Sequence, residues 1–202
     1  MKRIARHAGW LAGLLFATAV IGFGAALDGY SQAQHPVALL GARGVPHALV
    51  FNLAGFVLPG VLALLVGLEL RRHMSPASRW SARIGAQLVL LSALAFAVQG
   101  WLPLDPSDLE ASGNRLHATA WMLWWIAFVP GAWLLAHGWR SLALISVVAA
   151  VVVLGFGLFA AGAMAPGTAQ RIAFGAWFAW FAVAGLTRTA ASARGSSPTA
   201  RA

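Results

Sequence analysis

The segment Gln99–Trp121, QGWLPLDPSDLEASGNRLHATAW, decides how the rest of the chain can fold. It is a polar stretch between two long apolar runs. It holds three of the chain's five acidic residues, Asp105, Asp108 and Glu110. Apolar sequence resumes at His117. We therefore interpret the segment as a loop that connects two membrane-spanning helices.

The composition is typical of an integral membrane protein. Of the 202 residues, 60% are hydrophobic and only 9% are charged, and the mean hydropathy is +0.76. Soluble domains carry about 25% charged residues. A helix crosses the hydrocarbon core with about 20 apolar residues, and several such runs are present. We expect one membrane domain over residues 8–188, between a basic N-terminus at 1–7 and a disordered tail at 189–202.

The charge and the absence of cysteine exclude several classes of function. A net charge of +9 would suggest nucleic-acid binding in a soluble protein, but here the basic residues stand at the ends of apolar runs. We therefore expect no nucleic-acid partner. Without Cys, disulfides, thiolate chemistry and zinc–thiolate sites are excluded. No Gly-rich phosphate loop, nucleophile elbow or HExxH sequence occurs, and we expect no cofactor.

The apolar runs predict an all-α, polytopic membrane protein with six transmembrane helices. A cleaved signal peptide, ending near Gly24–Ala26, is an alternative for the first run. That run is longer than the roughly 7–15 apolar residues of a signal peptide, so an uncleaved helix is preferred. The predicted helices cover residues 8–27, 47–70, 84–102, 117–137, 141–163 and 170–187.

The basic residues predict the orientation of these helices. If the N-terminus is cytoplasmic, 11 of the 14 Lys and Arg residues fall on the cytoplasmic side and four of the five acids on the other. Only Arg43, Arg115 and Arg171 are basic residues outside, and Glu69 is the acid inside. This distribution obeys the positive-inside rule. We expect a cell (inner or plasma) membrane protein with both termini in the cytoplasm.

Some of the runs resemble one another. PHALVFNLAGFVLPG from Pro46 and LHATAWMLWWIAFVPG from Leu116 share His-Ala, Phe-Val and Pro-Gly, and the sixth run fits more loosely with Arg171 in the His place. This similarity favours three repeated helical hairpins with their loops outside. Chance similarity among helices rich in Ala, Gly and Phe is the alternative. Pro59 and Pro130 lie inside predicted helices and are expected to kink them.

Tryptophan spacing defines two helix faces. Trp121, Trp124 and Trp125 share one face, and Trp177 and Trp180 share another. We expect these faces to contact lipid rather than to bind a cofactor.

The outer loops carry a pattern that resembles a known family. The first gives HPVALLGARG followed by PHALVFNLAG, and the second gives GWLPLDPSD followed, after a spacer, by GNRLHATA. Over nearly the whole chain this pairing resembles the domain of unknown function 998 family of small multi-pass prokaryotic membrane proteins. Trp101-Leu102-Pro103 departs mildly from the Phe-Pro of the family pattern. The resemblance implies a membrane protein of six or seven helices and no particular activity. Its most specific pieces are His35-Pro36, Asn52, Pro103 with Asp105, and His117.

Polar residues gather near the predicted outer ends of the helices. Because polar groups are costly in lipid, they should face the bundle interior or water. We expect a polar pocket that opens outward. The candidate ligand-binding residues are His35, His47, Asn52, Gln99, Asp105, His117 and Arg171.

Three residues of this set stand at the first turns of predicted helices, namely His47, His117 and Arg171. Helix N-termini attract anions, so a ring of these residues would suit a phosphate or carboxylate headgroup. Asp105 is expected to accept a hydrogen bond from His117 and to fix its tautomer. The alternative is that all three residues are interfacial anchors that point outward.

The preferred function is binding of a lipid, a small amphiphile or a partner membrane protein, without chemistry. The alternative is a metal-dependent, membrane-embedded hydrolase with His35, His47, Asp105 and His117 as ligands. No pair among them has helical ligand spacing, so the preferred interpretation includes no metal. A transporter or channel is disfavoured because no charged residue lies in the middle of a predicted helix.

Overall fold

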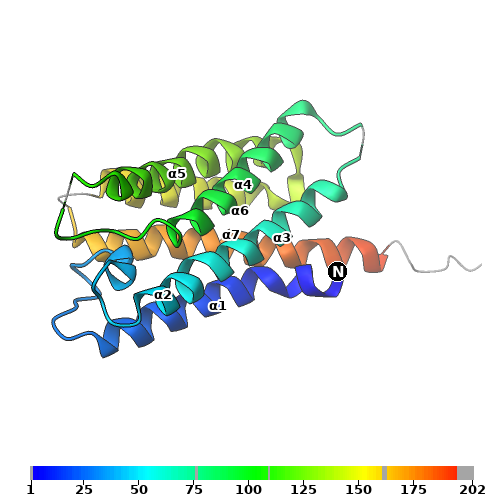
Figure 1. The fold of residues 1–202 in the computed structure, drawn as a ribbon. Coiled ribbons are helices and arrows are strands. Elements are labelled where there is room, and N and C mark those ends of the chain that lie inside the picture. Colours follow the sequence, from blue (N-terminus) through cyan, green and yellow to red (C-terminus); the bar gives the residue numbers. More distant parts are fainter. Residues whose placement is uncertain (1, 76, 109, 161–162, 195–202) are drawn as a thin grey trace, which may run out of the picture.

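The computed structural model describes residues 2–75, 77–108, 110–160 and 163–194, and the regular elements within them are helices (Figure 1). Two of the short elements, η1 and η3, are 3-10 helices, and two, η2 and η4, are π-helices. The elements are α1 (Lys2–Ala26), η1 (Val37–Gly41), α2 (Ala48–Phe51), η2 (Asn52–Val57), α3 (Leu58–Arg72), α4 (Trp80–Gln99), α5 (Ser112–Gly138), η3 (Arg140–Leu142), α6 (Ala143–Leu154), η4 (Gly155–Phe159) and α7 (Pro166–Arg194).

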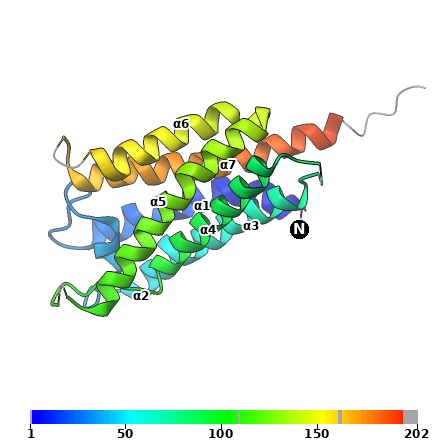
Figure 2. The same ribbon diagram turned by 90° about the horizontal axis from the view of Figure 1, so that it is seen from above.

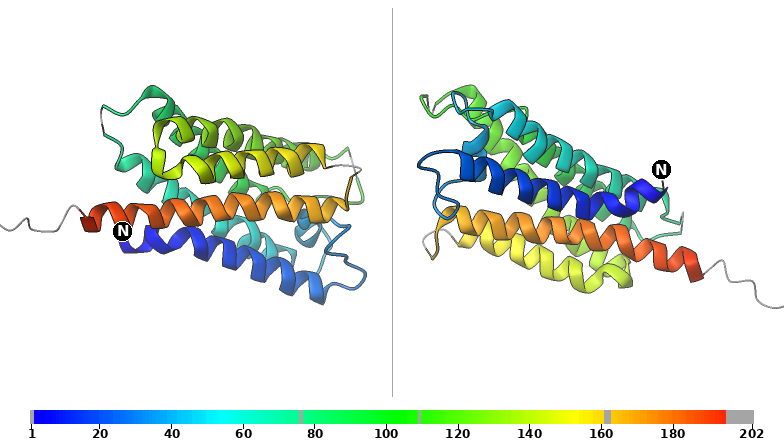
Figure 3. Two further views of the ribbon diagram at one scale, coloured as in Figure 1. Left: turned by 180° about the vertical axis from the view of Figure 1, so that it is seen from behind. Right: turned by 90° about the horizontal axis from the view of Figure 1, so that it is seen from below.

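The long helices pack as a closed ring. Along the chain α1, α3, α4, α5, α6 and α7 each contact the next, and α7 returns to lie beside α1 (Figures 2 and 3). The connections α1–α2, α4–α5 and α6–α7 lie at one end of the bundle (Figure 1). We call this the acidic end, because it carries Asp28 and Asp105. The opposite end, here called the basic end, carries the N-terminus and the α3–α4 loop with Arg79.

Within the described residues, five segments are long and apolar enough to cross a membrane, as the sequence predicted for them. The helix α7 is not among these five segments. It nevertheless packs along both α1 and α6 as a member of the ring. The five segments are Arg6–Ala26, Ala48–Arg72, Trp80–Gln99, Ser112–Gly138 and Arg140–Leu158.

Several helices extend beyond the apolar runs that predicted them. The helix α1 begins at Lys2 rather than at 8, and α5 begins at Ser112 rather than at 117. The run predicted at 170–187 is part of α7, Pro166–Arg194. An apolar run predicts only the part of a helix that can lie in lipid. The backbone hydrogen bonds of the helix can continue into polar sequence on either side of that run. Residues 189–194 therefore belong to α7, and the rest of the expected tail, 195–202, lies outside the described residues.

The second run is not one regular helix. A π-helix, η2, separates α2 from α3, and Pro59 stands in the first turn of α3. Proline lacks an N–H and its ring collides with the preceding helical turn. In this chain the turn before Pro59 is the wider π-helix η2. The departure from regular α-helix that was expected at Pro59 therefore lies in η2. Pro130, in contrast, lies inside the continuous helix α5.

The centre of the ring is aromatic. Phe96 of α4 stacks on Trp177 of α7 with ring centroids 4.7 Å apart, and Phe16 of α1 lies 4.9 Å from Phe178. The prediction that Trp124, Trp177 and Trp180 face lipid was wrong, because all three side chains are 0% exposed. Helical spacing shows which residues share a face, but lipid and a membrane-protein interior are both apolar, so spacing cannot show which of the two that face meets.

Candidate functional site

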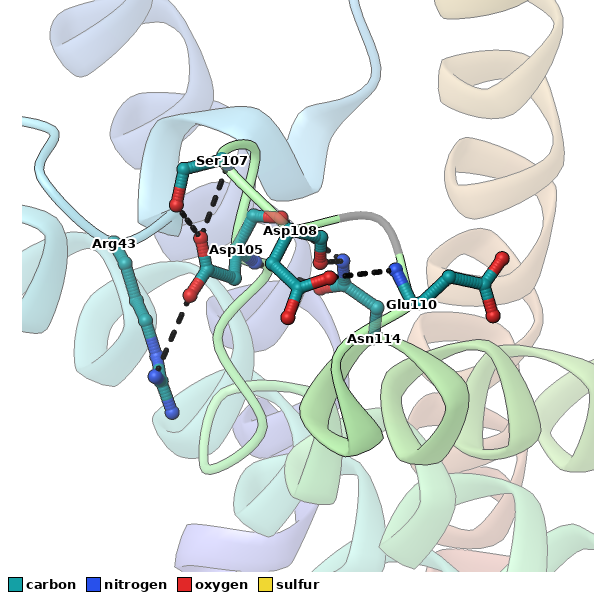
Figure 4. Close-up of polar contacts among 6 residues, drawn as sticks. All are labelled: Arg43, Asp105, Ser107, Asp108, Glu110 and Asn114. Atoms are coloured by element: carbon teal, nitrogen blue, oxygen red, sulfur yellow. Dashed lines mark hydrogen bonds and ion pairs between the residues drawn. The ribbon is translucent and has the colours of Figure 1, made fainter.

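The loop before α5 is held by its own side chains at the acidic end (Figure 4). The Asp105 N–H donates to Asn114 Oδ1 at 2.7 Å, and Asn114 Nδ2 donates to the carbonyls of Asp105 and Asp108 at 2.9 Å each. Asp105 Oδ1 accepts from the Ser107 N–H at 3.1 Å and from Ser107 Oγ at 2.5 Å. These bonds place Asn114, in the first turn of α5, as the anchor of the loop.

The same aspartate connects the two larger loops of this end. Arg43 Nη1 lies 3.5 Å from Asp105 Oδ2 (Figure 4). The Arg43 N–H also donates to the Leu104 carbonyl at 2.7 Å. Hydrogen bonds from Ser107, with a smaller contribution from Arg43, hold the pKa of the Asp105 carboxyl below its usual value. Asp105 is therefore an ionised structural residue of the loops.

His117 does not bond to Asp105, contrary to the sequence prediction. Its Nδ1 lies 2.8 Å from the Leu102 carbonyl, and its ring lies edge-on to Phe56. A carbonyl only accepts, so Nδ1 carries the proton. The side chain is 8% exposed. His117 thus ties α5 to the segment after α4.

Two other candidate residues are buried in the same region. Asn52 Nδ2 donates to the Gly41 carbonyl at 2.9 Å, and the Asn52 side chain fills the space that a Cβ on Gly41 would need. Gln99 is 1% exposed, and its Nε2 has no hydrogen-bond partner among the described residues. Asn52 therefore fixes η1 against η2, while Gln99 ends α4 inside the bundle.

The two remaining histidines of the candidate set lie in loops. His47 is exposed and precedes α2 with a left-handed backbone, φ 59°. His35 Nδ1 accepts from the Ser31 N–H at 3.0 Å. Among the described residues no group of three or more His, Asp or Glu side chains could hold a metal ion. The four residues of the metal alternative are thus not gathered into one such group.

Arg171 is the candidate residue with the most polar contacts. Its Nη1 donates to the carbonyls of His35 at 3.1 Å and Gly167 at 2.8 Å. Its Nη2 donates to Tyr30 Oη at 2.6 Å, and its Nε donates to Gln32 Oε1 at 3.0 Å. The structure therefore brings Arg171 and His35 together, but no hydrogen bond within the described chain joins Arg171 to His47 or His117.

The charge of Arg171 is not neutralised by these contacts. All four acceptors are neutral, because burial raises the pKa of the Tyr30 hydroxyl above its ordinary value, against the opposing effect of Arg171 itself. The ion pairs found in the described parts of the chain do not include Arg171. Arg171 thus combines a fixed position with an uncompensated positive charge.

Arg171 lies at one end of a groove between α1 and α7. The groove has a volume of about 570 Å³, and Arg171 and Gln32 are its polar lining residues apart from the Trp10 indole. Gln32 closes this end, since its Nε2 donates to the Val20 carbonyl of α1 at 2.9 Å while its Oε1 accepts from Arg171. The apolar lining is formed by Gly9, Trp10, Gly13, Leu14, Phe16, Ala17, Val20, Ile21, Gly175, Phe178, Ala179 and Ala182.

The sequence interpretation missed this groove and two of the polar contacts of Arg171, Tyr30 and Gln32. A signal was present in the spacing of small residues. Gly9, Gly13 and Ala17 recur every four residues on α1, and Gly175 and Ala179 do so on α7. Such spacing places small side chains along one helix face.

Comparison with known proteins identifies a family. Residues 11–187 match the family model described as "Protein of unknown function (DUF998)". No curated protein and no solved structure matches the chain.

Proposed function

The chain belongs to the DUF998 family of proteins of unknown function, and from this membership and the α1–α7 groove we propose that it is a membrane protein that binds one anionic amphiphile. The apolar chain of the ligand lies between α1 and α7. Its carboxylate or phosphate headgroup meets Arg171 at the acidic end.

The observation that carries this proposal is an uncompensated guanidinium at the end of an apolar groove. Arg171 donates four hydrogen bonds to neutral acceptors, which leaves one of its five N–H groups and its full charge for an anion. Ligand pockets of about 300–1,000 Å³ are lined mainly by apolar side chains with a few polar groups that fix orientation. The groove, at about 570 Å³, has this character.

The membrane setting supports the same proposal. We place the protein in the cell membrane with α7 as its sixth crossing and with the basic end in the cytoplasm, because the Lys and Arg residues cluster at that end. The Arg171 end of the groove then lies near the outer headgroup layer. An amphiphile would enter sideways from the outer leaflet, or a membrane-anchored partner would deliver it.

Binding of oleate and of uncharged oleyl alcohol to purified protein in neutral detergent tests the role of Arg171. We expect Arg171→Gln to weaken oleate binding about tenfold, the value of a lost charge-assisted contact, and to leave oleyl alcohol binding unchanged. Arg171→Lys keeps the charge and should lose less. Equal oleate binding by wild type and Arg171→Gln would contradict the proposal.

Filling the groove gives an independent test. Ala17 and Ala179 line the groove from its two walls, so Ala17→Leu and Ala179→Leu should weaken binding of both ligands. Ala25 is exposed on the same helix as Ala17 but does not line the groove, so Ala25→Leu is the matched control. If Ala17→Leu and Ala179→Leu bind both ligands as tightly as Ala25→Leu does, the ligand lies elsewhere.

A further inference from the structure

A second, more polar pocket lies at the basic end, where α3 ends and α4 begins. It has a volume of about 330 Å³ and is lined by Arg71, Met74, Ser75, Arg83 and Gln87. Arg71 of α3 and Arg83 of α4 thus border one hollow, and no acidic residue lines it within the described part of the chain. We propose that this pocket binds a phosphate group, supplied either by an anionic lipid headgroup or by a soluble phosphate compound.

Arg71 is oriented toward this pocket by a neutral partner. When the Gln87 amide is placed with its oxygen toward the guanidinium, that oxygen lies 3.0 Å from Arg71 Nη2 and 3.3 Å from both Nε and Nη1. This placement is required because a guanidinium only donates hydrogen bonds. The amide restricts the direction of the Arg71 side chain, and the ion pairs among the described residues do not include Arg71.

Arg83 is held by a different neutral contact. Its guanidinium carbon lies 5.4 Å from the centre of the Trp80 ring, in the range of a cation–π interaction. Both residues are on the first two turns of α4, so the stacking restricts Arg83 without consuming its charge. Planar guanidinium groups pair with phosphate oxygens through two parallel hydrogen bonds, which favours phosphate over a smaller anion such as chloride.

The acidic residue nearest in sequence does not line this pocket. Glu69 lies 3.5 Å from His73 Nδ1, one helical turn away on the same helix end. The pocket also stands at the junction of two helix ends, the depth at which lipid headgroups lie. It is therefore a separate site from the α1–α7 groove, whose cation lies at the opposite end of the bundle.

Calorimetric titration of the full chain in neutral detergent tests this site. The probes are short-chain phosphatidylglycerol, phosphatidylcholine of the same chain length, and inorganic phosphate. The titrations use the Arg171→Gln background, so that the groove does not contribute an anion site. We expect phosphatidylglycerol to bind and phosphatidylcholine not to bind above background.

The variants separate a built pocket from general basic charge. Arg71→Gln and Arg83→Gln should each weaken phosphatidylglycerol binding about tenfold, while Arg79→Gln should change it less than about twofold. Arg79 is a matched control because it is an exposed arginine of the neighbouring α3–α4 loop that does not line the pocket. Gln87→Ala should weaken binding by less than either arginine substitution, since Gln87 only orients Arg71. Thermal unfolding of each variant confirms that it is folded.

Two outcomes would overturn the proposal. One is equal weakening by Arg79→Gln, Arg71→Gln and Arg83→Gln, because diffuse charge would then explain all binding. The other is binding of neither phosphatidylglycerol nor inorganic phosphate. Competition by inorganic phosphate assigns the site to soluble phosphate compounds, whereas lipid binding that free phosphate does not displace assigns it to a lipid headgroup.

Discussion

Two buried tryptophans of the core each donate a hydrogen bond to a serine hydroxyl group. Trp180 Nε1 donates to Ser146 Oγ at 2.8 Å, and Trp177 Nε1 donates to Ser92 Oγ at 3.0 Å. All four side chains are buried. An indole N–H without a partner in such a place costs free energy, so each serine allows a large aromatic residue to lie inside the ring.

Ser146→Ala should therefore lower the free energy of unfolding by about 1 kcal/mol, and at most about 3 kcal/mol, because it leaves the Trp180 N–H unpaired. Thermal or denaturant unfolding in mild detergent measures the change. In the Trp180→Phe background the serine has no partner, so adding Ser146→Ala should cost much less. Fully additive effects of the two substitutions would show that the hydrogen bond contributes nothing.

At the scale of helices, the contact between α1 and α7 depends on a residue without a side chain. A Cβ on Gly9 would collide with the backbone carbonyl of Phe181, whereas a Cβ on Gly22 of the same helix would meet nothing within 4 Å. The two helices approach this closely only because position 9 is glycine.

We expect Gly9→Val to destabilise the protein by about 1–3 kcal/mol, the cost of overpacking, and to weaken amphiphile binding by moving one wall of the groove. Gly22→Val is the matched control and should do neither. Unfolding in detergent and the oleate titration measure both effects. Equal stability of the two variants would contradict the close packing of α1 on α7.

Helices were easier to predict than their contacts. The apolar runs located the five candidate crossings, because length and hydropathy carry that information directly. The buried face of Trp177 could not be predicted, since lipid and core are equally apolar.

The partner of His117 was missed for another reason: it is a backbone carbonyl, at Leu102, and carbonyls are present at every position of a sequence. Arg171 is held by four hydrogen bonds, but its neighbours Tyr30 and Gln32 come from a loop whose path the sequence does not show.

At the scale of the whole molecule, the orientation in the membrane can be measured by labelling single introduced cysteines, because the chain contains no cysteine of its own. Single cysteines at Ser75 and Asp108 lie in loops at opposite ends of the bundle. An impermeant maleimide should label Asp108→Cys in intact cells, and Ser75→Cys only after permeabilisation. Labelling of Ser75→Cys in intact cells would reverse the proposed orientation and place Arg171 on the cytoplasmic side.

The ring is closed by a contact between its first helix, α1, and its last helix, α7, so this contact forms late in synthesis. In the proposed topology α7 is the last crossing to be synthesised, so the glycine face of α1 would stay uncovered until α7 inserts. During that interval the space that α7 will occupy is open to lipid. The anionic amphiphile proposed for the groove can therefore be captured while α7 inserts, and the cell would then carry the protein already loaded from the moment of its synthesis.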